Sequence, residues 1–345
     1  MPPRWVRRPL GLLLIAAAVL AATALPLLLL GAALASLFVP GRWRPLRVLT
    51  FTLVYLAIEV AGLAVAFALW VASGFGWKLR SPAFQRAHYA VLHALLAEAE
   101  LSARLVFKVR MVTDGASWSP VDDGVPGSTN AMIVLSRHAG PGDSFLLVRT
   151  LLNRDHLRRP RIVLKETLQL DPLIDVYLNR LPNYFVPIAR QPGADPAAGI
   201  GKLAQNLGDE DALLIFPEGG NFTPRRRRRA IDKLRALGRR REAAQAAAME
   251  HVLAPRAAGV QAALAAAPHA DVVFVAHTGL ERFSTIRDLY RGIPMDTELR
   301  MRWEFIPAAD VPRDAQSQVD WLYHHWAEID SWIDQHVSAP VAPSP

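Results

Sequence analysis

The sequence predicts an α/β domain with a mostly parallel central sheet flanked by helices, preceded by an N-terminal hydrophobic helical hairpin. Two long stretches near the N-terminus carry almost no charge. Beyond them, short β-rich runs alternate with helical ones, and four of these runs are continuously apolar. Continuous apolar runs are typical of parallel strands covered on both faces. Alternation of strands and helices is typical of α/β domains.

The hairpin is predicted within residues 1–80. The stretch Leu10–Val39 is nearly all Leu, Ala, Val and Ile, and Val48–Trp77 holds a single acidic charge, Glu59. Each stretch exceeds the roughly 20 residues that a helix needs to cross a bilayer. A cleaved signal peptide has a shorter apolar core and no second apolar segment behind it. We therefore predict membrane-bound helices, the first kinked at Pro26.

Basic residues flank both apolar stretches. They are Arg4, Arg7 and Arg8 before the first, Arg42, Arg44 and Arg47 between the two, and Lys78, Arg80 and Arg86 after the second. The excess at the two ends predicts an inner or plasma membrane protein whose main domain lies on the cytoplasmic face. The basic turn fits a hairpin that dips into one leaflet as well as one that crosses the bilayer, and the sequence leaves both open.

Residues 81–337 are predicted to form one α/β domain, which is long enough to bury a proper core. The predicted strands are 107–112, 131–136, 161–165, 184–188, 212–216 and 271–276, with an edge strand at 300–306. The predicted helices are 81–106, 143–153, 171–181, 196–207, a long Ala/Arg-rich stretch from Pro224, and 313–337. A loop rich in Gly, Pro, Asp and Ser is predicted at 114–130, and a disordered tail at 338–345.

The net charge of +8 has a local origin. Ten basic residues lie between Glu218 and Arg241 against two acidic ones, which accounts for the whole excess. Anionic lipid headgroups or a phosphorylated substrate are the expected partners of such a surface on a membrane-held protein. Nucleic acid is not an expected partner, because no aromatic stacking residues are interleaved with the arginines. The lack of cysteine excludes disulfides and thiolate metal sites.

The first candidate for chemistry follows the predicted strand 131–136, because sites in open α/β sheets form at the carboxyl ends of strands. There His138 precedes Asp143 by five residues, with Gly-Pro-Gly in the intervening loop. Such a loop is able to fold the carboxylate back onto the imidazole, which makes a general base with an orienting acid. A core or capped histidine is the structural alternative. The neighbouring Ser144 lacks the Gly-x-Ser-x-Gly elbow of a nucleophile.

The chain contains its own control for this spacing. His325 and Asp330 are also five residues apart, but they lie within the predicted helix 313–337. Five residues on a helix turn by about 140°, so these two side chains are predicted to point apart. No histidines and carboxylates stand at a recognisable metal-ligand spacing, and no metal site is predicted.

The second candidate follows the predicted strand 212–216, where Pro217 and Glu218 lead into a glycine-rich turn. Glycine allows backbone N–H groups to approach a phosphate closely. Taken alone, Glu218 is as suited to capping the turn as to binding a ligand. Five arginines follow, Arg225 to Arg229. The sequence allows two interpretations of them, a solvated helix face or part of a phosphate site.

Together, the two segments resemble the lysophospholipid acyltransferase family, typified by 1-acylglycerol-3-phosphate acyltransferases. That family carries a His-x4-Asp box, a later Phe-Pro-Glu-Gly box and a short apolar strand beyond it. These correspond in order to His138–Asp143, Phe216–Gly219 and Val272–Ala276. Val163–Leu168 and Phe185–Arg190 are similar to the block between the first two boxes. The resemblance covers roughly residues 48–335.

The resemblance implies a glycerolipid acyltransferase-like fold and a membrane-bound enzyme without a cofactor. The enzyme would move a fatty acyl group from acyl-CoA or acyl carrier protein to a hydroxyl of a lysophospholipid. The implied catalytic residues are His138 and Asp143. The implied substrate-binding residues are Lys165, Arg190, Glu218, Gly219, Gly220, Asn221, Arg225 and Arg226.

Two departures from the family pattern bear on the acceptor. Gly220 and Asn221 stand where the family usually has Thr-Arg, whose arginine is thought to hold the acceptor phosphate, and Phe274–His277 lacks the usual proline. One of Arg225 and Arg226 is predicted to take over this contact, while the remaining arginines face lipid. An acceptor without the glycerol phosphate, such as a glycolipid, is the alternative. A non-enzymatic, membrane-anchored basic scaffold is a second alternative.

Overall fold

The computed structural model describes residues 2–113, 130–140, 142–153, 158–187, 195–279, 281 and 286–337. Its centre is a seven-stranded sheet with the order β1-β7-β6-β2-β5-β3-β4. All neighbours pair in parallel except β6 and β7, so the predicted mostly parallel sheet is confirmed. The strands are β1 (Val109–Thr113), β2 (Met132–Ser136), β3 (Arg159–Lys165), β4 (Tyr184–Val186), β5 (Asp211–Ile215), β6 (Asp271–Thr278) and β7 (Thr297–Ile306).

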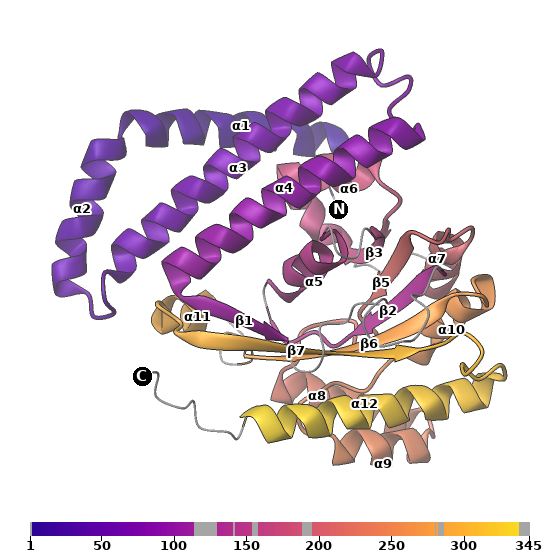
Figure 1. Cartoon of the computed structure of the whole chain (residues 1–345). Helices are drawn as coiled ribbons and strands as arrows, with labels where there is room; N and C mark the ends of the chain where they lie inside the picture. The colour runs from indigo at the N-terminus through magenta and orange to yellow at the C-terminus, as the bar shows by residue number, and fades with distance from the viewer. Residues whose placement is uncertain are drawn as a thin grey trace.

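Helices cover both faces of the sheet (Figure 1). The period of two along β2 sends Met132 and Val134 into one core and Ile133 and Leu135 into the other. The first core is closed by α4 (Pro82–Phe107), α5 (Asp143–Leu151) and α6 (Pro172–Arg180). The second is closed by α7 (Pro196–Ala204), α8 (Pro224–Ala236), α9 (Arg240–Ala248), α10 (Ala257–Ala266) and α12 (Ala315–Val337). Two short helices, η1 (Glu166–Leu170) and α11 (Ile286–Gly292), complete the described elements that follow α4.

The N-terminal region contains three helices rather than the two of the predicted hairpin. They are α1 (Arg4–Thr23), α2 (Leu25–Phe38) and α3 (Arg44–Ala72). The first apolar stretch breaks at Ala24, beside Pro26 in the first turn of α2, where proline needs no N–H partner and is favoured. By length and composition alone, α1 and α3 are able to cross a membrane.

The apolar helices are attached to the outer side of α4 and α6. Gly62 of α3 is buried against Leu95 and Leu173, where an added Cβ would lie 2.4 Å from a Leu173 methyl carbon. The hydroxyl of Tyr177 donates to the Gly62 carbonyl at 3.0 Å. Arg7 of α1 is buried and pairs with Asp175 of α6 at 3.1 Å. These contacts fix the helices on the same face of the sheet as α4, α5 and α6.

Two element predictions need correction. The segment predicted as an edge strand at 300–306 is β7, which begins at Thr297 and lies between β1 and β6. Strand β1 pairs in parallel with the other side of β7, where Val109–Thr113 lie opposite residues 297–301. The long helix from Pro224 is divided into α8 and α9 at Gly238, whose φ of +73° ends a helix readily. The predicted tail 338–345 lies outside the described residues.

Candidate active site

His138 and Asp143 form a hydrogen-bonded pair at the carboxyl end of β2. The Nδ1 atom of His138 lies 2.8 Å from Asp143 Oδ2. Gly142, with a φ of +98°, turns the chain so that α5 begins at Asp143. The side chain of His138 is 16% exposed, whereas that of Asp143 is 1% exposed. With Nδ1–H donated to the carboxylate, Nε2 carries the lone pair that is able to accept a proton.

The carboxylate of Asp143 is held by several donors. Its Oδ2 also accepts from the backbone N–H groups of Ala139 at 2.9 Å and Gly140 at 3.3 Å, and its Oδ1 accepts from the Ser144 N–H at 2.6 Å. Burial would raise the pKa of Asp143, but the hydrogen bonds from His138 and from the Gly140 N–H outweigh it and hold the pKa below its usual range. Asp143 is therefore ionised at neutral pH and fixes the His138 tautomer.

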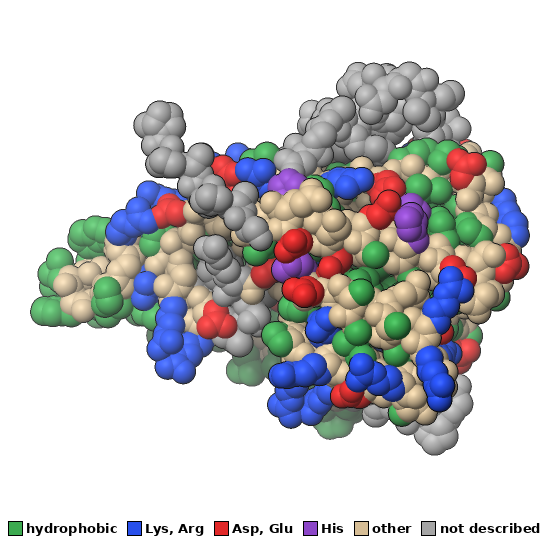
Figure 2. Space-filling model, turned by 90° about the horizontal axis from the view of Figure 1, so that it is seen from below, with side chains coloured by type: hydrophobic (Ala, Val, Ile, Leu, Met, Phe, Trp, Pro, Cys, Tyr) green, Lys and Arg blue, Asp and Glu red, His purple; other side chains and the backbone are tan. Residues whose placement is uncertain are grey.

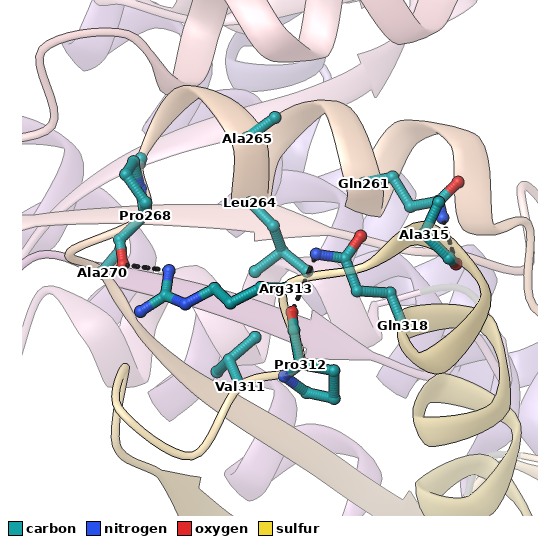
Figure 3. Close-up of a pocket in the computed structure, with 11 residues that line it drawn as sticks. Gln261, Leu264, Ala265, Pro268, Ala270, Val311, Pro312, Arg313, Ala315 and Gln318 are labelled. Carbon is teal, nitrogen blue, oxygen red and sulfur yellow. Dashed lines mark hydrogen bonds between the residues drawn. The ribbon is translucent and has the colours of Figure 1, made fainter.

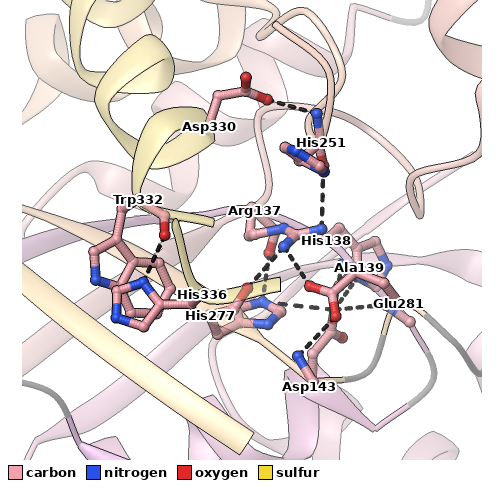
Figure 4. A network of polar contacts seen from close by, with 12 residues as sticks. Arg137, His138, Ala139, Asp143, His251, His277, Glu281, Asp330, Trp332 and His336 are labelled. Atoms are coloured by element: carbon pink, nitrogen blue, oxygen red, sulfur yellow. Dashed lines mark hydrogen bonds and ion pairs between the residues drawn. The ribbon is translucent and has the colours of Figure 1, made fainter. Parts of the chain in front are cut away.

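Buried polar and charged side chains lie beside this pair (Figure 4). Arg137 is fully buried, and it donates to the His277 carbonyl at 2.8 Å and to Glu281 Oε1 at 2.7 Å. His277 Nε2 lies 3.1 Å from the Arg137 carbonyl and 3.9 Å from Asp143 Oδ2. Burial lowers the pKa of His277, so the ring is neutral and donates to that carbonyl. Arg137, His277 and Glu281 were not predicted from the sequence, although Phe274–His277 departs from the family pattern.

Glu218 lies inside the protein rather than on the surface of the site. It is 2% exposed, and its carboxyl oxygens have no hydrogen-bond partner among the described side chains. Burial raises the pKa of Glu218 to about 8. The two sequence segments meet just above it, because the Phe222 N–H donates to the His138 carbonyl at 2.8 Å. Glu218 is thus enclosed beneath the turn that follows β5, away from solvent.

Three cations converge on the turn formed by Gly219 and Gly220. A Cβ added at Gly219 would lie 2.7 Å from Arg256 Cζ, and one at Gly220 would lie 3.3 Å from an Arg226 nitrogen and 3.8 Å from Lys165 Nζ. Desolvation and the positive charges of Arg226 and Arg256 lower the pKa of Lys165, while Asp143 opposes them. We call Lys165, Arg226 and Arg256 the cation cluster. Two of its members were predicted, and Arg256 was missed because it is 35 residues beyond Asn221.

The other predicted site residues have different positions. The backbone carbonyl of Asn221 accepts a hydrogen bond from the Arg226 guanidinium at 3.0 Å. Arg225 is exposed on α8, and no described contact joins it to His138 or to the cation cluster. Arg190 lies outside the described residues. His325 and Asp330 do not pair, as predicted: Asp330 accepts from the backbone N–H groups of residues 250 and 251 at 2.9 and 2.6 Å.

One group of metal-ligand type is found among the described residues. Glu304 on β7 and His325 and Glu328 on α12 have ligand atoms within 4.8 Å of one another. His325 Nδ1 lies 3.0 Å from Glu328 and 3.4 Å from Glu304, and its ring stacks on Phe274. The group is on the face of the sheet covered by α12, so it is separate from His138.

A cavity of about 400 Å³ lies between α10 and the segment that leads into α12 (Figure 3). Its polar side chains donate hydrogen bonds to neighbouring backbone carbonyls. Gln261 donates to the Ala315 carbonyl at 2.8 Å, and Arg313 donates to the Pro268 carbonyl at 3.1 Å. The cavity borders Ala270, at the start of β6, whereas His138 lies at the opposite edge of the sheet. It is not part of the site.

The raised pKa of Glu218 makes a testable contribution to stability. The folded chain keeps this proton up to about pH 8, while the unfolded chain loses it near 4.5. Stability from this group is therefore present below pH 4.5 and lost as pH rises to about 8, by at most ~1.4 kcal/mol per pH unit. We expect Glu218→Gln to reduce the fall in Tm between pH 5 and pH 8, measured by thermal unfolding in detergent. The exposed Glu98→Gln is the control, and a Glu218→Gln curve parallel to the wild type would contradict the assignment.

Comparison with known proteins gives two similarities. Residues 122–275 match a family model described as Acyltransferase, a region that includes His138, Asp143 and the cation cluster. An uncharacterized acyltransferase of Schizosaccharomyces pombe is 23% identical over 158 residues, which cover 42% of this chain and 42% of that protein. The chain thus spans less than half the length of this relative. No solved structure matches it.

Proposed function

We propose that the chain transfers a fatty acyl group from a thioester to a hydroxyl of a lysophospholipid, because residues 122–275 match a family model described as Acyltransferase. The donor is acyl-CoA or acyl carrier protein, and a 1-acylglycerol-3-phosphate-like lipid is the acceptor. The observation that carries the proposal is the His138–Asp143 hydrogen bond of 2.8 Å beside a cluster of three cations. It pairs a general base with an anion site at one edge of the sheet.

The proposed reaction is a direct transfer. Nε2 of His138 takes the proton of the acceptor hydroxyl while the hydroxyl oxygen attacks the thioester carbonyl. The C–S bond then breaks, and the imidazolium returns the proton to the leaving thiolate, which yields an ester and a free thiol. Asp143 stabilises the imidazolium and keeps Nδ1 protonated. No acyl-enzyme is needed.

The cation cluster supports a phosphorylated acceptor. The family's usual arginine is absent at Asn221, but Lys165, Arg226 and Arg256 place positive charge around the same turn. Charge-assisted hydrogen bonds to a phosphate are shorter and stronger than neutral ones. The absence of that arginine favours the second candidate, an acceptor without a phosphate such as a glycolipid.

Mass spectrometry of lipids distinguishes these acceptors. The full-length protein is incubated in membranes with labelled acyl-CoA or acyl carrier protein and a mixture of lysolipids with and without a phosphate monoester. We expect the label in the product of the phosphate-bearing acceptor. Label only in glycolipid products would support the second candidate, and no labelled lipid with either donor would overturn both.

We further propose that the apolar helices hold the domain on one leaflet of the inner or plasma membrane, on its cytoplasmic face. The large apolar side chains of α1 and α2 are exposed, including Leu12, Leu27 and Phe38. Arg44, the first residue of α3, donates to the backbone carbonyls of residues 291 and 293 of the domain. Later in α3, Ala66 accepts from Arg180 at 2.8 Å. A helix bound to the domain near both its ends supports a hairpin that dips into the bilayer.

This topology is testable because the chain has no cysteine. Single replacements Pro40→Cys, Lys78→Cys and Lys202→Cys put one thiol at the α2–α3 turn, after α3 and on the domain, all at exposed positions. A membrane-impermeant thiol reagent should label all three in inside-out vesicles and none in intact spheroplasts. Labelling of Pro40→Cys from the opposite side to Lys202→Cys would show that the hairpin crosses.

A further inference from the structure

The strongest concentration of charge on the molecule is on α8 and the start of α9. Six cations of α8 are exposed, as are three around the start of α9: Arg225, Arg226, Arg228, Arg229, Lys233, Arg235, Arg239, Arg240 and Arg241. We call these residues the α8–α9 basic surface. Figure 2 looks onto this side of the molecule, where Lys and Arg side chains gather along the lower margin.

Much of this charge is not neutralised. Ion pairs of 3.5, 3.3 and 3.0 Å join Arg235 to Asp232, Arg239 to Glu242 and Arg241 to Asp320. Exposed pairs of this kind contribute little. Within the described part of the chain, no ion pair is found for Arg228, Arg229 or Lys233, among others.

The surface lies on the opposite face of the sheet from the apolar helices. Ile231 of α8 packs in the core closed by α12, whereas α1 and α3 are attached to α4 and α6 on the other face (Figure 1). A bilayer that covers α1–α3 therefore leaves α8 toward water. This position does not fit the expectation that the arginines face lipid.

The surface is also anchored by hydrogen bonds and continuous with the candidate active site. Arg227, the one inward arginine of the run, donates to the carbonyls of Met249 and Ala247 at 2.5 and 2.7 Å. Thr223 caps the first turn of α8 by accepting from the Arg226 N–H at 3.2 Å. Arg226 belongs to both the basic surface and the cation cluster. A partner seated along α8 would thus have one end beside His138.

We propose that the α8–α9 basic surface docks an acidic carrier protein that delivers the acyl group as its thioester. The inference rests on the proposed acyl transfer and names the donor. The thirteen residues of α8 extend over about 20 Å. Cations spread along that length match the acidic face of a protein helix, whereas the phosphates of a nucleotide donor are confined to one end. Complementary charge of this kind mainly raises the rate of encounter and is screened by salt.

The test compares two donors that carry the same acyl chain. The full-length enzyme in neutral detergent is assayed with purified acyl carrier protein, loaded with the acyl group, and with acyl-CoA. We expect Arg228→Glu/Arg229→Glu/Lys233→Glu to lower kcat/KM for the carrier-protein donor at least tenfold and for acyl-CoA less than twofold. The wild type should lose carrier-protein activity steeply with added salt, and the variant should not.

The control is Lys202→Glu/Arg287→Glu, which reverses exposed cations on α7 and α11 and should leave both donors unaffected. Retained acyl-CoA activity shows that the triple variant is folded. An equal loss of activity of the triple variant with both donors would overturn the docking proposal. So would a variant that is fully active in neutral detergent and loses activity only when assayed on anionic vesicles. A wild type that uses acyl-CoA but not the carrier protein would overturn it too and leave the proposed function standing. No transfer from either donor would instead contradict the proposed function.

Discussion

Replacing His138 by alanine is expected to lower kcat for acyl transfer at least a hundredfold and to leave membrane association unchanged. A positioned general base contributes roughly 10²- to 10⁴-fold to such reactions. The side chain of His138 is only partly buried and its ring meets Phe216 at 4.8 Å between centroids, so its removal does not empty the core. The measurement is the initial rate of ester formation from labelled acyl thioester at saturating acceptor.

Asp143→Asn should lower kcat by a similar order, because an amide has one acceptor oxygen instead of two and no charge to stabilise the imidazolium. The matched control is His325→Gln, since His325 and Asp330 share the spacing but lie on α12. That variant should keep its turnover. Near-normal activity of His138→Ala would remove the pair from the mechanism, whatever the other variants show.

The second large effect is expected for Arg256→Gln. This variant should have a ten- to hundredfold higher KM for a phosphate-bearing acceptor. A charge-assisted hydrogen bond is worth about 1.5–3 kcal/mol, and its loss from ground-state binding appears in KM with kcat little changed. Arg226→Gln and Lys165→Gln should behave alike, because all three side chains surround the Gly219–Gly220 turn.

The control for this experiment is Lys202→Gln, an exposed cation on α7 outside both the cluster and the α8–α9 basic surface. Assays in neutral detergent remove the contribution of bilayer charge. An unchanged KM in all three cluster variants would show that the cluster does not hold the acceptor. The same loss with an acceptor that lacks the phosphate would show that the cluster acts on something else.

Some residues of the site were predictable because their partners are close in sequence. The His138–Asp143 bond spans five residues, and glycine at 142 permits the turn that makes it. The two main boxes were expected at the carboxyl ends of parallel strands, and the Phe222–His138 hydrogen bond joins them directly. Arg256 and Arg137 were not predictable in this way. Arg256 enters the site through the segment before α10, and the partners of Arg137 are 114 to 144 residues away.

By itself, the sequence determined the class of the sheet, the order of the strands and helices along the chain, and the pairing of His138 with Asp143. These depend on periodicity, turn residues and local spacing, which act over a few residues. The tertiary structure decided the inner position of β7, the burial of Glu218, the attachment of α3 to the domain, and the place of α8 on the face away from the apolar helices. These depend on which strand pairs with which and which face a helix covers. Such choices are made by contacts between distant segments, and no local pattern in the sequence encodes them.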